Sequence, residues 1–221
     1  MIRFDQVHKR YANGREALAE VSFKIDKSEM VFLTGHSGAG KSSILKLIAL
    51  IERPTRGQVF VNDQNTAAVA STGIPQFRRQ IGVVFQDHKL LHDRLVADNV
   101  ALPLIIAGLP KREIDKRVRA ALDQVGLLGK EKNLPLELST GEQQRVGIAR
   151  AVVAKPALLI ADEPTGNLDP ELALEIMRLF KRFNGVGVTV VIATHNVQLI
   201  DQLGARRIVL GDGRVTDLGL P

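Results

Sequence analysis

The chain has 221 residues, of which 45% are hydrophobic and 24% charged, a composition typical of a soluble globular protein with one sizeable core. It has no cysteine, which excludes disulfides and thiolate metal sites, and no apolar run of about 18 residues that would span a bilayer. Because the first residues lack an apolar signal-peptide core, we expect a cytosolic protein.

The formal net charge is +6, which suits either nucleic acid or an anionic membrane surface as a partner. The basic residues are dispersed in short pairs, such as Arg78-Arg79 and Lys111-Arg112. Eight phenylalanines and one tyrosine are the only aromatic residues, and no RNA-recognition motif is visible. We therefore expect no specific nucleic-acid binding.

The first 25 residues predict two antiparallel strands joined by a turn. Apolar and polar residues alternate over residues 2–7 and 21–25, and Asn13-Gly14 between them is typical of a turn. Tyr11, the only tyrosine, lies in this connection. Its ring either stacks on an adenine base or packs against the protein, and both interpretations stay open.

A glycine-rich loop follows the next apolar run, residues 31–33, and precedes a helical pattern. Its sequence, GHSGAGKS, fits the phosphate-binding form GxxxxGK[ST] in the strand–loop–helix context that this motif requires. Backbone N–H groups, the helix dipole and the Lys41 charge together predict a cradle for a nucleoside triphosphate, with Ser42 donating an oxygen to Mg²⁺. The predicted cradle consists of Gly35, His36, Ser37, Gly38, Ala39, Gly40, Lys41, Ser42 and Ser43.

Residues 59–61 and 81–85 predict further strands, and Gln86 closes the second of them. Gln86 either contacts Mg²⁺ and the attacking water or is an ordinary polar residue at a strand end. The chain then becomes mostly helical, and residues 111–125 form one amphipathic face that Gly126 ends. Four apolar side chains before these helices either line a groove for a partner or belong to the core: Leu90, Leu91, Leu95 and Val96.

The segment LSTGEQ, residues 138–143, opens another helix, and Ser139 is a natural N-cap. Free N–H groups and the helix dipole make this end either a second anion site, formed by Ser139, Gly141 and Glu142, or an ordinary capped helix. If the segment faces outward, it can cap a phosphate held by another subunit.

Residues 158–163, LLIADE, predict a buried strand that ends in two acids. Asp162 would bind Mg²⁺ through water, and Glu163 would orient or deprotonate an attacking water. Asp169 caps a further helix that we expect to bury four apolar side chains and to end at Asn184-Gly185; these side chains are Leu172, Ile176, Leu179 and Phe183.

The last predicted elements are a strand over residues 188–192 and a hairpin formed by residues 208–210 and 214–215. His195 follows the strand and either bonds the γ-phosphate and the attacking water or has a structural role. The whole chain, residues 1–221, therefore predicts one α/β domain. It has a P-loop NTPase core with a mainly parallel sheet, an antiparallel β subdomain and a helical subdomain over approximately residues 87–155.

The order of these motifs, ending in Asn167-Leu168-Asp169 and His195, resembles the nucleotide-binding subunits of ABC ATPases over the full length of the chain. The resemblance implies Mg²⁺-dependent hydrolysis of ATP by a head-to-tail homodimer. Each ATP would lie between the phosphate loop of one copy and Ser139–Gly141 of the other. Lys41, Gln86, Glu163 and His195 would be the catalytic residues, and Ser42, Gln86 and Asp162 would hold the metal.

Several segments are further similar to the bacterial cell-division branch of this family, among them Ile51–Pro54, Phe85–His88 and Asp98–Gly108. That similarity implies a four-span membrane partner, FtsX, and other division proteins. The chain would lie peripherally on the cytoplasmic face of the inner membrane, at the septum. ATP turnover would activate periplasmic peptidoglycan hydrolysis, and the stretch 87–108 would receive the membrane subunit.

The chain departs from the family pattern at Thr140, where glycine is common, at Asn196, where aspartate is usual, and at Ser43 in place of threonine. Two alternatives remain open at this stage. One is the motor of a lipoprotein-release or macrolide-export transporter. The other is a soluble ABC ATPase of DNA repair or translation, which the short separation of Gln86 from Ser139 disfavours because it leaves no room for a long coiled coil.

Overall fold

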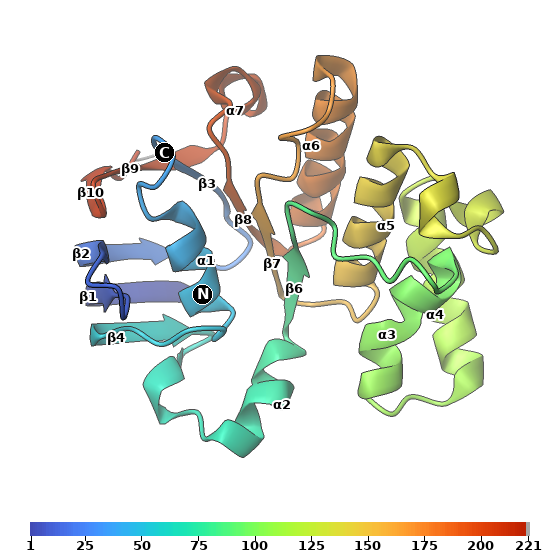
Figure 1. Cartoon of the computed structure of the whole chain (residues 1–221), viewed down its shortest axis with the longest axis horizontal. Coiled ribbons are helices and arrows are strands. Elements are labelled where there is room, and N and C mark those ends of the chain that lie inside the picture. The colour runs from blue at the N-terminus through green and yellow to red at the C-terminus, as the bar shows by residue number, and fades with distance from the viewer. Residues whose placement is uncertain (220–221) are drawn as a thin grey trace.

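The computed structural model describes residues 1–219 and contains two sheets that share one core (Figure 1). The larger sheet has six strands, and parallel pairing runs from β9 to β6, whereas β10 pairs antiparallel with β9. Its order is β10 (Arg214–Asp217), β9 (Arg206–Gly211), β3 (Met30–Thr34), β8 (Thr189–Ala193), β7 (Leu158–Asp162) and β6 (Ile81–Val84).

The smaller sheet is antiparallel and comes from the first 65 residues of the chain. Its order is β2 (Glu16–Ile25), β1 (Ile2–Arg10), β4 (Arg56–Val61) and β5 (Gln64–Asn65). Alternate residues of β1 and β2 face the core, and Phe4 stacks on Phe23 with ring centroids 4.5 Å apart. Such cross-strand aromatic pairs hold the register of a sheet.

The helices cover the two faces of the large sheet (Figure 1). The α-helices are α1 (Lys41–Ile48), α2 (Ile74–Arg78), α3 (Val96–Ile106), α4 (Lys111–Gln124), α5 (Thr140–Val152), α6 (Pro170–Gly185) and α7 (Val197–Leu203). Short 3₁₀ turns cover Thr66–Ala68, Ser71–Gly73, Leu128–Lys130 and Pro135–Glu137. None of these helices, over residues 1–219, is long and apolar enough to cross a bilayer.

Alternation along β3 divides the core into two layers. Phe32 contributes to the layer beneath α3, α4, α5 and α6, whereas Val31 and Leu33 contribute to the layer formed by α1 and the small sheet. Because successive side chains of a strand point to opposite faces, a strand buried on both sides is a continuous apolar run. This explains the uninterrupted apolar segments that the sequence carries at residues 30–33, 158–161 and 190–193.

The predicted fold class is confirmed, and most predicted elements lie where the pattern puts them. Helix α4 buries the expected face and is followed by Gly126 at φ +71°, a left-handed conformation that ends the helix. Three details differ. The short helices α2 and α7 were not expected, because they have only five and seven residues. Leu172, expected to be buried, is only half-buried in α6, where it lies close to Gly141 of α5.

Candidate functional site

The phosphate loop, residues 35–42, connects β3 to α1 at the carboxyl edge of the large sheet. Gly35 has φ +138°, and a Cβ atom built on it would lie 2.1 Å from the carbonyl oxygen of Leu210. Only glycine fits this position, because any side chain would collide with the backbone of β9. The strand next to β3 therefore supports the loop directly.

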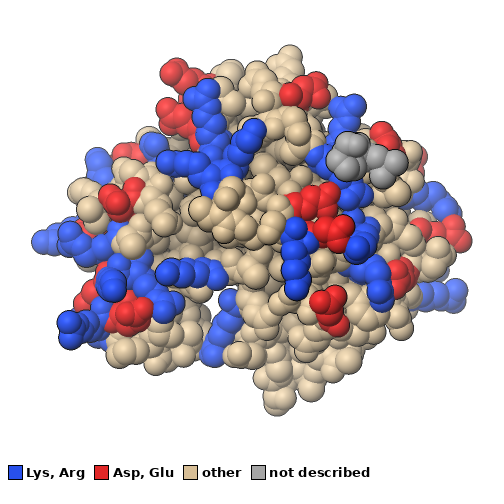
Figure 2. Space-filling model, turned by 180° about the vertical axis from the view of Figure 1, so that it is seen from behind, with Lys and Arg blue, Asp and Glu red and all other residues tan. Residues whose placement is uncertain are grey.

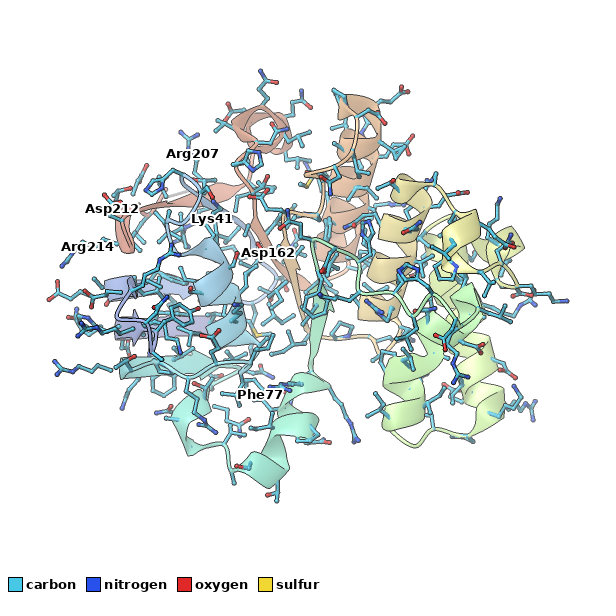
Figure 3. The ribbon with its side chains drawn as sticks, in the orientation of Figure 1. Lys41, Phe77, Asp162, Arg207, Asp212 and Arg214 are labelled. Atoms are coloured by element: carbon cyan, nitrogen blue, oxygen red, sulfur yellow. The ribbon has the colours of Figure 1, made fainter. Side chains whose placement is uncertain are left out.

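Lys41 is the first residue of α1, and its side chain folds back over the loop (Figure 3). Its Nζ donates hydrogen bonds to the carbonyl oxygens of Gly35, at 2.7 Å, and His36, at 3.1 Å. The first turn of α1 contains no acidic residue, and its N-cap, Gly40, makes no side-chain cap bond. The helix dipole and the ammonium group thus combine at one place, which favours an anion.

One cavity of about 660 Å³ brings most of the predicted residues together. It extends from the β1–β2 turn across the phosphate loop to the ends of β6, β7 and β8. The residues that line it are Tyr11, Arg15, Ala17, Ser37, Gly38, Gly40, Lys41, Ser42, Ser43, Lys46, Gln86, Glu163 and His195. A volume of this size is within the range of small-molecule sites.

Glu163 and His195 face each other across the ends of two neighbouring strands. Asp162 pairs in register with Ala193, so the residues just beyond β7 and β8 come close together. The Glu163 Oε2 atom lies 3.0 Å from His195 Nδ1, and the Glu163 N–H donates to the Ala193 carbonyl at 2.9 Å. The carboxylate side chain is only 14% exposed, whereas the imidazole is 70% exposed. This arrangement orients a carboxylate towards the cavity and leaves the histidine free to contact a ligand.

Asp162 lies at the end of β7, on the same edge of the sheet as Lys41 (Figure 3). Burial raises the pKa of its carboxyl group, while a hydrogen bond with Ser42 acts in the opposite direction. It does not line the large cavity but a smaller one of about 80 Å³ that Ser42 also lines. A hydroxyl and a carboxylate are therefore adjacent, with the Gln86 amide on the wall of the larger cavity.

Tyr11 lines the rim of the cavity and is anchored by its hydroxyl group. The Tyr11 Oη atom is 3.1 Å from Ser43 Oγ and donates to Glu52 Oε1 at 3.3 Å. The ammonium group of Lys9 lies 5.1 Å from the ring centroid, within cation–π range. The ring thus packs against the protein and borders the cavity at the same time.

The side chain of His36 points away from the predicted cradle. Its Nε2 atom lies 3.4 Å from Asp212 Oδ1, in the turn between β9 and β10, so this histidine contributes its backbone to the loop. Gly35 and Ala39, also predicted for the cradle, are not among the residues that line the cavity. Arg15 was missed: it lines the cavity and donates to the Gly38 carbonyl at 3.1 Å. The sequence signal that could have found Arg15 was its position just after the Asn13-Gly14 turn, close to Tyr11, which was already a candidate for the site.

The predicted second anion site begins α5. Ser139 Oγ accepts a hydrogen bond from the Glu142 N–H at 3.3 Å, and Glu142 Oε2 accepts one from the Ser139 N–H at 2.9 Å, which forms a capping box. The hydrogen bond from the Ser139 backbone lowers the pKa of Glu142. Among the described residues that line the large cavity, Ser139, Gly141 and Glu142 are absent. The two predicted anion sites, at the starts of α1 and α5, are therefore separate within one chain.

Acidic and basic side chains are interspersed over the face opposite the one drawn in Figure 1 (Figure 2). Elsewhere in the described chain, opposite charges pair as well: Arg117 with Glu113 at 2.6 Å, partly buried, and Arg214 with Glu20 at 2.7 Å, exposed. On that face, the described basic residues alternate with acidic ones and do not form one continuous basic tract.

A profile of the ABC transporter family matches residues 18–166. The chain is 58% identical over 215 residues to the cell division ATP-binding protein FtsE of Escherichia coli strain K12, covering 97% of both chains. It is 46% identical to the protein of the same name from Bacillus subtilis strain 168, covering 96% of this chain and 93% of the relative.

Among solved structures, an ATP-binding cassette in a dimeric, post-hydrolysis state bound to ADP and Pi superposes with a TM-score of 0.90. It is 35% identical, with 98% of this chain and 97% of that chain covered. A dimeric bacterial ABC transporter cassette gives the same TM-score at 36% identity and the same coverage.

Proposed function

The chain belongs to the ABC transporter family and is an ATPase of that family, and from this membership we propose that it powers a membrane complex of bacterial cell division. The observation that carries the proposal is the cavity in which the phosphate loop, Gln86 and the Glu163–His195 pair meet. These are the groups that hold a triphosphate and position a water molecule against its terminal phosphorus.

In the proposed reaction, the loop amides and Lys41 bind the β- and γ-phosphates, and charge developing on the γ-phosphate is stabilised by groups already in place. Lys41 exchanges its bonds with the Gly35 and His36 carbonyls for bonds with phosphate. Glu163 orients the attacking water and accepts its proton. His195 holds the Glu163 carboxylate through Nδ1 and offers its exposed edge to the γ-phosphate.

The donor set near Ser42 fits Mg²⁺. Mg²⁺ prefers hard oxygen ligands and keeps several of its waters, so a hydroxyl, one nearby carboxylate and an amide oxygen suffice when phosphate oxygens complete the shell. We assign Ser42, Gln86 and Asp162 to this role. The raised pKa of half-buried Asp162 supports it, since a carboxylate that is costly to ionise gains most from a bound cation. When bound, Mg²⁺ neutralises charge on the phosphates.

The second anion-binding end implies a second copy. The start of α5 is capped and exposed at Ser139 and Thr140 but does not line the chain's own cavity. We propose that Ser139, Gly141 and Glu142 cover the γ-phosphate held by a partner copy, so that two ATP molecules are enclosed by a head-to-tail dimer. The dimeric cassettes at 35% and 36% identity support the formation of a dimer. Asn167–Asp169, with Asn167 and Asp169 exposed just before α6, would lie at the same interface.

The partner on the membrane side is proposed to be FtsX, with other division proteins attached to the complex at the septum. The relatives at 46–58% identity carry cell-division names, which favours this assignment over the transporter motors and soluble ATPases considered above. Residues 87–155 would act as a helical subdomain that contacts the membrane subunit. Exposed apolar side chains support this: Leu91 and Leu95 precede α3, and Ile105 and Ile106 end it. Leu90 and Val96, by contrast, belong to the core.

Two experiments test the proposal. Purified chain should hydrolyse ATP in a Mg²⁺-dependent reaction that Lys41→Ala abolishes, and a tagged chain should co-purify from membranes with a four-span protein. ATP hydrolysis that survives Lys41→Ala would contradict the site. A partner with a large hydrophobic cargo chamber, or no membrane protein at all, would contradict the cell-division role while leaving the ATPase assignment intact.

A further inference from the structure

A guanidinium group ties the loop after Gln86 to the helix that begins at Ser139. Arg150, in the last turn of α5, donates from Nη1 to the Lys89 carbonyl at 2.7 Å and from Nη2 to the His88 carbonyl. Charge-assisted bonds of this kind are roughly twice as strong as neutral ones, and a planar fork that grips two consecutive carbonyls fixes their orientation.

The gripped loop has an unusual backbone. His88 and Lys89 have φ values of +57° and +50°, in the left-handed region that residues other than glycine seldom adopt. Two consecutive left-handed residues cost free energy and persist only where surrounding contacts hold them. The Arg150 fork supplies such contacts at the carbonyls of these same two residues.

The helix and the strand before the loop also touch closely. A Cβ atom built on Gly82 of β6 would lie 2.4 Å from the Ala151 carbonyl, and one built on Gly147 would lie 4.0 Å from the His88 carbonyl. The buried side chain of Gln144 lies on the same helix and is close to His88. Strand β6 and the loop thus contact the C-terminal half of α5, with no side chain between strand and helix at Gly82.

Ser139 and Arg150 are about three turns apart on α5, roughly 16 Å along the axis of a rigid rod. If α5 moves as a rigid rod, a shift of the loop at one end of the helix shifts the capped end at the other. Gln86 lies on the wall of the chain's own cavity, and Ser139 is the end offered to the partner copy.

We propose that Arg150 is a positioning residue that makes Gln86 and the Ser139–Glu142 segment move as one unit. It links occupation of a chain's own ATP site to the cap that the chain gives its partner. This inference rests on the proposed function, because it assumes ATP in the cavity. The inference predicts positive cooperativity between the two ATP sites of the dimer. The loop and α5, held together by Arg150, would form a rigid element whose position depends on the occupation of both sites.

Hydrogen exchange tests the link in three variants: Arg150→Met, which loses every donor, Arg150→Lys, which keeps the charge, and the control Arg112→Met on the exposed face of α4. Without nucleotide, Arg150→Met should speed amide exchange in residues 86–90 about tenfold, whereas the control should not, because an unheld loop opens more often. Arg150→Lys should restore part of the protection. Unchanged exchange in Arg150→Met would overturn the inference.

The second readout uses ATP in the folded variants. In the unmodified chain, ATP should protect residues 138–144 as well as the phosphate loop, and turnover should rise with a Hill coefficient above 1. In Arg150→Met, affinity for a fluorescent ATP analogue should stay within about twofold, while kcat falls about tenfold and the Hill coefficient drops towards 1. Retained cooperativity in Arg150→Met would overturn the link. If Arg150→Met does not fold, amide exchange and cooperativity are both measured on Arg150→Lys instead.

These results separate the inference from the proposed function. Exchange at residues 86–90 is measured without nucleotide, so it reports on the Arg150 contact even if the chain does not hydrolyse ATP. Loss of ATP binding in the unmodified chain would instead contradict the proposed function.

Discussion

Ser139 serves two roles that one substitution can separate. Within the chain it caps α5, and in the proposed dimer it contacts the partner's γ-phosphate. Ser139→Asp keeps the cap, because aspartate and serine are equally good N-caps and the helix dipole favours a negative charge there. Ser139→Ala removes the cap and adds no charge.

Ser139→Ala should cost more folding stability than Ser139→Asp, whereas Ser139→Asp should cost more dimer affinity than Ser139→Ala. Ser139→Ala should lower the free energy of unfolding by about 1 kcal/mol, and Ser139→Asp by less than about 0.5 kcal/mol. In the dimer, a new carboxylate about 4 Å from a phosphate charge costs about 4 kcal/mol at an effective dielectric constant of 20, or roughly a thousandfold in affinity. The alanine variant loses only a hydrogen bond to a charged group, about 1.5–3 kcal/mol.

Urea denaturation measures the first quantity, and sedimentation with ATP in a Glu163→Gln background measures the second. We expect Ser139→Asp to be the more stable monomer and the weaker dimer. If it dimerised with ATP as well as the parent, the α5 end would not meet the partner's phosphate. If it unfolded more easily than Ser139→Ala, the cap would not follow helix-capping rules.

Glu163→Gln should retain ATP binding, lose turnover by at least about a hundredfold as general-base loss does, and accumulate as an ATP-bound dimer in gel filtration; unchanged turnover would refute its role. Asp162→Asn should melt higher than the unmodified chain at about pH 8, because burial raises the pKa of the carboxyl and makes its ionised form costly when folded. The difference in melting temperature should disappear as the pH falls through the raised pKa of Asp162. A difference that did not change with pH in scanning calorimetry would count against the burial of the ionised carboxylate as its cause. Tyr11→Ala should weaken affinity for a fluorescent ATP analogue about tenfold, whereas Tyr11→Phe keeps the ring and should stay near the parent; equal losses would assign the effect to the hydroxyl bonds with Ser43 and Glu52. Phe180→Ala should cost about 3–5 kcal/mol in urea denaturation because the ring is fully buried, and Val186→Ala, an exposed control, should change little.

Local patterns predicted the parts of the site that local physics determines. The glycine spacing located the phosphate loop, and Ser139 and Asp169 were identified as caps because a capping side chain bonds an amide only three residues away. The strand ends that carry Asp162 and Glu163 followed from the apolar runs before them.

Tertiary packing decided what the sequence left open. Leu90 and Val96 are buried whereas Leu91 and Leu95 are exposed, a division that depends on where α3 and α5 lie and not on hydrophobicity. The outward rotamer of His36 depends on Asp212, which lies 176 residues further along the chain. Arg15 and Arg150 were overlooked because an arginine that grips distant carbonyls has no signature of its own.

The phosphate loop is supported by residues from opposite ends of the sequence. Cβ atoms built on Gly40 and Gly213 would lie 2.7 Å and 2.9 Å from the same Ala17 carbonyl oxygen, so three segments converge on one backbone atom. During synthesis the loop leaves the ribosome long before Gly213 does. A nascent chain should therefore become able to bind nucleotide only late in synthesis, when the β9–β10 hairpin docks. Incomplete chains would then not dimerise around ATP.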